Sequence, residues 1–291
     1  MSTPSVVTDS TAYLPPELIK ALDISVVSLY YSFEEGGARR ENEVADLGAF
    51  FDRLTDPGSL STTQPPVVED FLIAYEPLLA GGGEVISIHI SSGLSETCER
   101  ARAAADVLRD AGKGGERIHV VDSASTGGAL GILALVAARG AARGESAASI
   151  LETVRQARLE AKTWYLLDTL EFLRRGGRIG GATAWIGSTL NIKPILAVET
   201  EMRAVERVRS RQRGVERLVE LARQLQASGA CAWCVQHSRV PDEALAFATR
   251  LQDVFWRPPE FVTEVGPVIG THSGPGLLGV GGVPIRFLEG A

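Results

Sequence analysis

Cysteine, net positive charge and long apolar runs are all scarce in this sequence. Three cysteines among 291 residues are too few for a disulfide framework. The formal net charge of -7 offers no basic footprint for phosphate backbones, so we expect no nucleic-acid partner. The most apolar run, residues 129–138, is shorter than the roughly 20 residues that span a bilayer and is typical of a buried helix. We therefore predict no transmembrane segment, while transient contact with a membrane stays open.

Signals of secretion and of common enzymes are also lacking. The first ten residues contain neither the basic region nor the apolar core of a signal peptide, which predicts a soluble, cytoplasmic protein. No Walker loop, no H-E-x-x-H and no G-x-S-x-G sequence occurs. Residues 274–279 match the dinucleotide pattern G-x-G-x-x-G, but too few residues follow them to complete a βαβ unit.

Cys231 and Cys234 have the spacing of a redox or zinc motif. The residues around them, 230–237, have the pattern of a strand, in which side chains three positions apart point to opposite faces. Two sulfurs on opposite faces cannot share one metal ion, so we expect buried structural cysteines instead. The sequence predicts no metal site, no cofactor and no catalytic residue.

Strand and helix patterns alternate in the first half of the chain. Apolar strand patterns at 6–8, 84–90 and 118–121 are followed by helical patterns, of which 94–111 is the clearest. This alternation is typical of βαβ units and a parallel sheet. Ligands of such sheets bind beyond the carboxyl ends of the strands.

The pattern changes after about residue 160. Strand patterns at 192–199 and 202–209 are joined by a tight turn near Thr200, a hairpin that a parallel sheet does not supply. We predict an α/β protein with an N-terminal parallel-sheet domain over residues 1–160 and a C-terminal α+β domain over residues 161–291. The sequence gives this boundary only approximately, and it leaves open whether the last strand returns to the first domain.

Four segments place small hydroxyl residues and glycines where a strand or loop gives way to a helix. A helix N-terminus presents unpaired N–H groups and a partial positive charge, which together suit an anion. Each segment alone is also an ordinary helix cap. Several of them at successive strand ends of a parallel sheet would converge, and this favours an anion site. The segments are 9–11 (DST), 60–66 (LSTTQPP), 90–97 (ISSGLSET) and 122–128 (DSASTGG).

Two glycine-rich segments add one basic or titratable side chain each. Arg178 lies in GGRIGG at 176–181, and His272 lies in GTHSGPG at 270–276, which we expect to be a rigid loop. Glycine lets a backbone approach a ligand closely. A surface arginine and a satisfied histidine are the simpler alternatives for each residue alone.

These residues together resemble a known family. VVTDST, TTQPP, ISSGLSET, VVDSASTGG, LEFLRRGGRI, LNIKPIL and EVGPVIGTHSGPG occur in this order between about residues 6 and 280. The ordered set is similar to that of the DegV family of bacterial fatty-acid-binding proteins. The resemblance implies two domains with a long-chain fatty acid held between them, the carboxylate at a hydroxyl-rich site and the tail in an apolar tunnel. It also implies that the acid is presented to a separate fatty acid kinase of the dihydroxyacetone-kinase type, which makes acyl-phosphate.

The resemblance carries over to individual positions. The first threonine of TTQPP, Thr62, is the best candidate to donate to the carboxylate, and the second, Thr63, stands where the family commonly has serine. Ser95 matches the serine of the LSGTY motif of the family, and Ser92 opens the same turn. The implied ligand-binding residues are, in chain order, Thr62, Thr63, Ser92, Ser95, Arg178 and His272.

Two positions depart from the family pattern. Glu96 replaces the glycine that follows Ser95, and Cys98 replaces a typical tyrosine. A carboxylate that faced the bound acid would repel it. We therefore expect the side chain of Glu96 to point to solvent.

The tail of the acid would supply most of the affinity. Burial of about ten methylenes at ~0.8 kcal/mol each gives roughly 8 kcal/mol before ordering costs. One apolar stretch has two equally good interpretations, as tunnel wall or as plain core. Its residues are Trp185, Ile186, Leu190, Ile192 and Ile195.

A basic stretch at 203–217 has two readings as well. It is either a docking surface for the kinase, centred on Arg207, Arg209 and Arg211, or a solvated hairpin and helix start with interleaved glutamates.

Two other functions stay open. A serine hydrolase would use Ser95 or Ser92 with His272 and an acid such as Asp122. A carrier of another small anionic ligand would use the same helix N-termini, which bind phosphate equally well.

Overall fold

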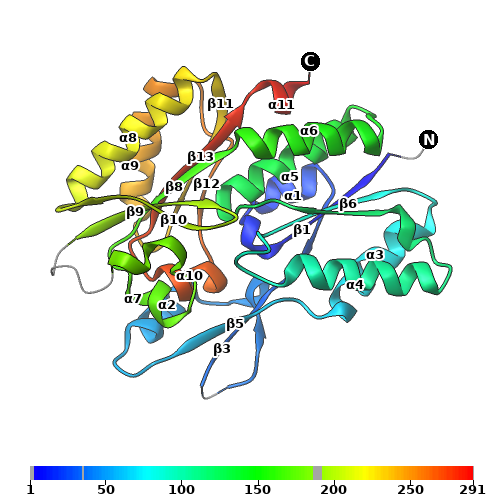
Figure 1. The fold of residues 1–291 in the computed structure, drawn as a ribbon, viewed down its shortest axis with the longest axis horizontal. Helices are drawn as coiled ribbons and strands as arrows, with labels where there is room; N and C mark the ends of the chain where they lie inside the picture. Colours follow the sequence, from blue (N-terminus) through cyan, green and yellow to red (C-terminus); the bar gives the residue numbers. More distant parts are fainter. Residues whose placement is uncertain (1–2, 35, 186–191, 291) are drawn as a thin grey trace.

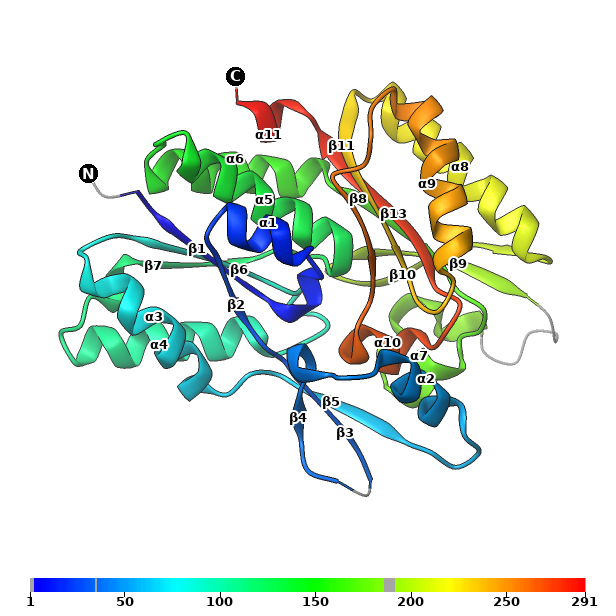
Figure 2. The same cartoon turned by 180° about the vertical axis from the view of Figure 1, so that it is seen from behind.

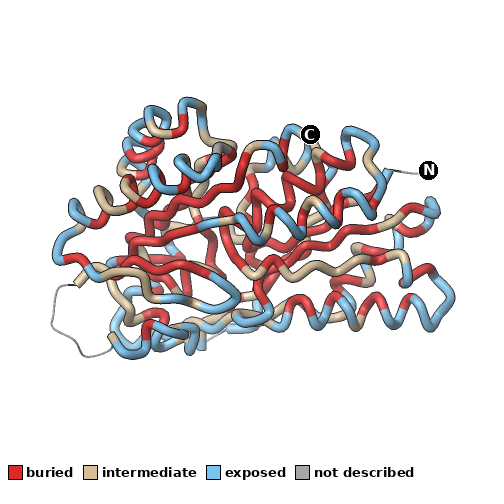
Figure 3. Tube along the Cα trace, turned by 45° about the horizontal axis from the view of Figure 1, so that its top comes forward, coloured by how far each residue is buried: buried red, intermediate tan, exposed pale blue. Residues whose placement is uncertain are grey.

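The computed structural model describes residues 3–34, 36–185 and 192–290 (Figure 1). Two sheets lie side by side with helices between and around them, and a small third sheet lies below the junction (Figures 1 and 2). Most residues of the two large sheets are buried (Figure 3). The predicted fold class, a parallel-sheet α/β part followed by an α+β part, is confirmed. Among the described residues, no helix is long and apolar enough to cross a membrane.

The first sheet is parallel throughout, as predicted. Its strand order is β2-β1-β6-β7. Neighbouring residues of one strand serve two different cores, since Val6 packs with the α5 side and Val7 with the α3 side. The strands are β1 (Ser5–Asp9), β2 (Ile24–Val27), β6 (Val85–His89) and β7 (Ile118–Asp122), and the helices of this part are α1 (Pro16–Ala21), α3 (Val68–Ala80), α4 (Thr97–Asp110), α5 (Gly127–Ala142) and α6 (Ala147–Glu160).

Helix α5 explains the apolar run that the sequence shows. It contacts β1 and β6 of the first sheet and also β11 and β13 of the second, while α6 packs beside it. Because α5 is enclosed on almost every side, all but one of its residues from Gly127 to Ala141 are buried. An apolar stretch without an amphipathic period is what such a position requires.

The second sheet is mixed, with strand order β10-β9-β8-β13-β11-β12. The hairpin near Thr200 is present, with Thr200 in the left-handed region at a φ of 67°. The last strand, β13, lies between β8 and β11 and so stays in the second sheet. The elements are β8 (Lys162–Leu166), β9 (Lys193–Glu199), β10 (Glu201–Val208), β11 (Ala230–His237), β12 (Phe261–Glu264), β13 (Leu278–Pro284), α8 (Arg211–Ala227), α9 (Pro241–Phe255) and α11 (Arg286–Glu289).

The two faces of the second sheet meet different neighbours. Trp233 and Val235 pack with α8 and α9, whereas Ala232 and Cys234 join the core around α5. Cys234 is therefore a buried structural cysteine, as expected, and its burial raises the pKa of the thiol. The side chain of Cys231 lies outside the described residues.

The small third sheet is antiparallel, with order β4-β3-β5. One local expectation is corrected here, since the residues expected as a rigid loop at 270–276 begin within a short helix. The consecutive strands β2 and β3 belong to different sheets. The elements are β3 (Tyr30–Phe33), β4 (Arg39–Arg40), β5 (Ser61–Gln64), α2 (Leu47–Thr55), α7 (Glu171–Arg175) and α10 (Pro267–Ser273).

Candidate ligand-binding site

A cavity of about 170 Å³ lies where all three sheets meet. Its lining comes from β5, from the loop between β6 and α4, from the N-terminus of α5, from β8 and β9, and from α10. Most of the lining side chains are apolar, and a few hydroxyls, one arginine and one histidine are set among them. The space far exceeds the room that one ordered water occupies. It can hold a ligand with a large apolar part and one polar end.

The structure brings four of the six predicted ligand-binding residues to this cavity, namely Thr63, Ser95, Arg178 and His272. They come from four separate parts of the chain. Thr62 and Ser92 do not line it.

Strand alternation separates Thr63 from Thr62. The Oγ1 of Thr63 lies 2.8 Å from Nε2 of His272 in α10, and Ser61 likewise bonds Thr271 of the same helix, with an Oγ to Oγ1 distance of 2.8 Å. Thr62 points to the opposite face, where its Oγ1 lies 2.9 Å from Oγ of Ser32 on the exposed side of β3. Side chains alternate along a strand, so the two threonines cannot both face the cavity.

The two serines of ISSGLSET also separate. Ser92 is exposed, and its Oγ donates to Oδ2 of Asp122 at 2.5 Å. Ser95 lies before the first turn of α4, where its Oγ is 2.8 Å from Oγ1 of Thr97. The geometry therefore favours Ser95 as the hydroxyl that reaches a bound ligand.

His272 is an uncharged hydrogen-bonding group in this site. Burial, and secondly the charge of Arg178, lowers the pKa of His272 from 6.5 to about 4. Its Nδ1 is buried and has no hydrogen-bond partner among the described residues. The ring packs directly on Gly176, where an added Cβ would lie 2.1 Å from Nδ1, so only glycine fits there.

Arg178 supplies the positive charge at the cavity. It is exposed, and its guanidinium donates to two backbone oxygens, those of Gly176 at 2.9 Å and of Leu94 at 3.3 Å. These bonds hold the side chain across the loop before α4. The other three N–H groups of the guanidinium form no hydrogen bond with the described residues and can meet an anion.

Glu96 contributes to the lining, but its carboxylate is directed to solvent. The side chain is 61% exposed, and its Oε2 accepts from Nη2 of Arg100 at 2.8 Å, one helical turn along. The prediction that the side chain of Glu96 points to solvent is confirmed.

Thr126 completes the polar part of the cavity and was not singled out as a ligand residue from the sequence. It is the N-cap residue of α5 and lines the cavity, and its Oγ1 is buried without a partner among the described residues. An unsatisfied buried hydroxyl is costly, so it is a natural contact for a polar ligand atom or a water. Its signal in the sequence is the DSASTGG segment, which marks the helix start without identifying the hydroxyl that faces inward.

Comparison with known proteins agrees with this arrangement. Residues 4–284 match the model of the family described as "Uncharacterised protein, DegV family". The chain belongs to the DegV family. It is 33% identical to Protein DegV of Bacillus subtilis over 279 residues, which cover 95% of this chain and 97% of that one.

Solved DegV-family structures share the fold. A DegV family protein from Thermus thermophilus, described by its fatty acid binding, has a TM-score of 0.88 at 31% identity and covers 97% of this chain and 99% of its own. DegV from Bacillus subtilis, described as a fatty acid binding protein, has a TM-score of 0.85 at 31% identity, with coverage of 97% and 100%.

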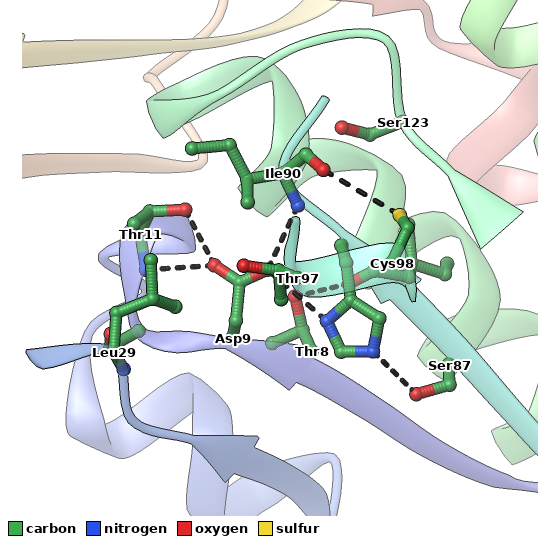
Figure 4. Close-up of polar contacts among 12 residues, drawn as sticks. Thr8, Asp9, Thr11, Leu29, Ser87, Ile90, Thr97, Cys98 and Ser123 are labelled. Atoms are coloured by element: carbon green, nitrogen blue, oxygen red, sulfur yellow. Dashed lines mark hydrogen bonds and ion pairs between the residues drawn. The ribbon is translucent and has the colours of Figure 1, made fainter. Parts of the chain in front are cut away.

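The DST segment of this DegV-family chain, residues 9–11, stabilises the loop between β6 and α4, which contributes to the cavity. Asp9 is fully buried, and its Oδ1 accepts from the backbone N and Oγ1 of Thr11 at 3.1 and 2.5 Å. Its Oδ2 accepts from the backbone N of Ile90 at 2.8 Å and lies 3.1 Å from Nδ1 of His89 (Figure 4). Asp9 thus fixes the start of the loop that carries Ser95, and it does not line the cavity itself.

The hydrolase set that the sequence leaves open, Ser95 or Ser92 with His272 and Asp122, does not form among the described residues. His272 bonds to Thr63, while Ser92 bonds to Asp122 and Ser95 to Thr97. A second set, in which Nε2 of His89 lies 2.6 Å from Oγ of Ser87, has Asp9 as its acid. That set is completely buried, so a substrate cannot reach its serine.

The apolar lining differs in part from the tunnel walls that the sequence suggests. On β9, Leu196 faces the cavity, whereas Ile195 packs on the other side with α8 and α9. Trp185 packs beside the core next to the cavity. Ile186 and Leu190 lie outside the described residues.

The three arginines suggested for partner docking lie in different environments. Arg209 is exposed, and the guanidinium of Arg207 lies 5.3 Å from the ring centre of Trp185. Arg211 is mostly buried and pairs with Glu243 at 2.5 Å and with Asp168 at 3.3 Å. Its donors are therefore engaged within the fold.

Proposed function

We propose that this protein binds a long-chain fatty acid in the cavity and presents it, in the cytoplasm, to a separate kinase of the dihydroxyacetone-kinase type without transforming it. The carboxylate would be held by Thr63, Ser95, Arg178 and His272, and the tail would lie along the apolar lining. The observation that carries the proposal is a largely apolar cavity whose few polar groups come from five separate segments. The fatty acid binding described for the Thermus and Bacillus relatives supports it.

The polar groups suit a carboxylate. Arg178 supplies the only full positive charge among the described lining residues, because His272 is neutral near pH 7. The hydroxyls and the imidazole add hydrogen bonds of little bulk, which a desolvated carboxylate requires. Hydroxyl donors hold one carboxylate oxygen and leave the other able to accept a phosphoryl group.

The first experiment is native mass spectrometry of the purified protein with lipid extraction. We expect a bound acid, which is displaced by added palmitate or oleate. A protein that carries no lipid and binds neither acid contradicts the proposal. Binding of short acids or phosphorylated metabolites alone would instead support the carrier of another small anion.

The presentation step needs its own test. With the kinase and ATP supplied, acyl-phosphate should form only when the loaded protein is present. Arg209→Glu should reduce its formation while fatty acid binding stays intact, because reversal of an exposed charge weakens docking more than folding. Arg155→Glu, an exposed arginine on α6, is the matched control. Arg211 is unsuitable for this test, since its reversal would break the contacts with Glu243 and Asp168.

A further inference from the structure

A second cavity lies on the other side of the loop that precedes α5. It has a volume of about 280 Å³ and does not share a lining residue with the first cavity. Three separate segments form it, namely the start of α5 with the loop before it, the junction of α6 with β8, and the turn between β9 and β10. A hydrogen bond from the N of Thr200 to the O of Ala124 at 3.0 Å joins the turn to the loop before α5, and Oγ of Ser91, in the loop between β6 and α4, donates to the O of Thr200 at 2.5 Å.

Two cationic side chains, Arg158 and Lys162, line this second cavity. Arg158 at the end of α6 is half-buried and Lys162 at the start of β8 is exposed. Neither forms an ion pair or a side-chain hydrogen bond with any of the residues that the structure describes. Glu199 also lines the cavity, but it is paired with Arg203 at 3.0 Å. The lining therefore has an excess of positive charge in a chain whose net charge is -7.

Ser125 provides a buried donor at the same place. Its backbone is satisfied, because its N donates to Oγ of Ser123 at 3.1 Å and its O accepts from the N of Ser91 at 2.8 Å. Its side chain is only 4% exposed, and its Oγ has no partner among the described residues. A buried hydroxyl without a partner is rare in native proteins and indicates a water or ligand contact.

The backbone explains why the two neighbouring hydroxyls serve different cavities. Thr126 is extended, with φ at -151° and ψ at 172°. In an extended segment successive side chains point to opposite sides. Thr126 accordingly lines the first cavity and Ser125 the second.

The N-terminus of helix α5 adds a partial positive charge to the second cavity. It spans 16 residues, and no side chain caps its first turn. Ala129, its third residue, lines the second cavity. The partial positive charge of this helix end adds to the charges of Arg158 and Lys162.

We propose that the second cavity is a binding site for a phosphate group, either as the free ion or as part of a small phosphate monoester. The donors come from two segments, the α6–β8 junction with Arg158 and Lys162 and the start of α5 with Ser125, and together they offer more N–H and O–H groups than the two oxygens of a carboxylate need, which suits a group with three or more acceptor oxygens. Arg158 and Lys162 supply charge and Ser125 supplies a fixed donor. This site is independent of the proposed fatty acid site, and each can be tested without the other.

The test is a calorimetric titration of the full-length, delipidated protein with inorganic phosphate and, separately, with phenyl phosphate at constant ionic strength. We expect saturable one-site binding and a loss of at least about tenfold in affinity for Arg158→Gln, since hydrogen bonds to charged groups are the strong ones. Ser125→Ala should weaken binding severalfold. Arg155→Gln, the same change on the same helix at an exposed arginine that pairs with Glu152, should leave binding unchanged.

The two titrations distinguish the two sources of the phosphate group. Binding of inorganic phosphate alone identifies a free-ion site, and binding of phenyl phosphate as well identifies a monoester site. If Arg158→Gln does not fold, Lys162→Gln replaces it, because Lys162 is exposed and its loss leaves no cavity. No saturable binding by the wild type up to about 10 mM of either probe, or equal weakening by the Arg155 and Arg158 variants, overturns the proposal.

Discussion

The hydroxyl of Thr63 and the Nε2 of His272 lie 2.8 Å apart, although 209 positions separate the two residues in the chain. This contact joins β5 of the small sheet to α10, which precedes the last strand of the second sheet. It brings together a hydroxyl from the first half of the chain and an imidazole from the second at a single cavity. A bound carboxylate would therefore connect both halves.

Thr63→Val should weaken fatty acid binding by about tenfold, because a hydrogen bond to a charged group contributes roughly 1.5 kcal/mol or more. Thr62→Val is the matched control, since it makes the same change on the next residue of the strand, whose side chain points to the other face. We expect it to bind the acid as the wild type does. Titration with a fluorescent fatty acid measures both variants. A larger loss for Thr62→Val would reverse the assignment.

His272 should remain neutral in the ligand-free protein throughout the physiological range. Burial lowers its pKa to about 4, below the ordinary 6.5. A lowered pKa means that its contribution to stability is fully present above pH 6.5 and is lost as pH falls toward 4. NMR of the imidazole ring should show no titration of His272 between pH 6 and 8. A midpoint within that range would mean that the ring is charged when the acid arrives.

Much of this site follows from the sequence, and the missing parts have physical reasons. The hydroxyl-glycine segments mark the ends of strands, which a parallel sheet gathers on one edge, so their convergence is predictable. The choice between Thr62 and Thr63 depends on the register of β5, and four polar residues without apolar alternation give no sign of it. The choice between Ser92 and Ser95 likewise depends only on the local turn in which each serine lies.

Other features depend on contacts that no local pattern encodes. His272 lies in a helix because α10 begins at Pro267, a good first residue, whereas the glycines around it suggest a loop. The apolar helix α5 was recognisable as buried, but its place between two sheets follows from the packing of the second half of the chain. From the sequence alone, Asp9 is interpreted as one more helix cap. The structure shows that it is buried and accepts from four donors.

Asp9→Asn should destabilise the fold and weaken fatty acid binding together. An amide retains one acceptor oxygen but places N–H groups against one of the two donor pairs, from Thr11 on one side and from Ile90 and His89 on the other. A buried clash of donors costs about 2–4 kcal/mol. Urea unfolding measures the loss, and Asp52→Asn, with a carboxylate that is 79% exposed, is the control. Unchanged stability would show that Asp9 does not hold the loop.

Glu41 should make stability depend on pH near neutrality. It is 3% exposed, and its Oε1 accepts from Oη of Tyr13 at 2.6 Å and from the backbone N of Val268 at 2.7 Å, at the start of α10. Burial raises its pKa from 4.5 to about 7. The folded protein therefore binds this proton more tightly than the unfolded chain, and the stability gained is fully present below pH 4.5 and lost as pH rises through 7.

Glu41→Gln removes that dependence, because the amide cannot ionise and still offers an oxygen to Tyr13 and Val268. Relative to the wild type, the variant should gain stability as pH rises from 5 to 8, by on the order of 1–3 kcal/mol. Urea unfolding of both proteins at these two pH values measures it, and all other titrating groups cancel in the difference. A difference that stays constant with pH would show that Glu41 is ionised in the folded protein throughout this range.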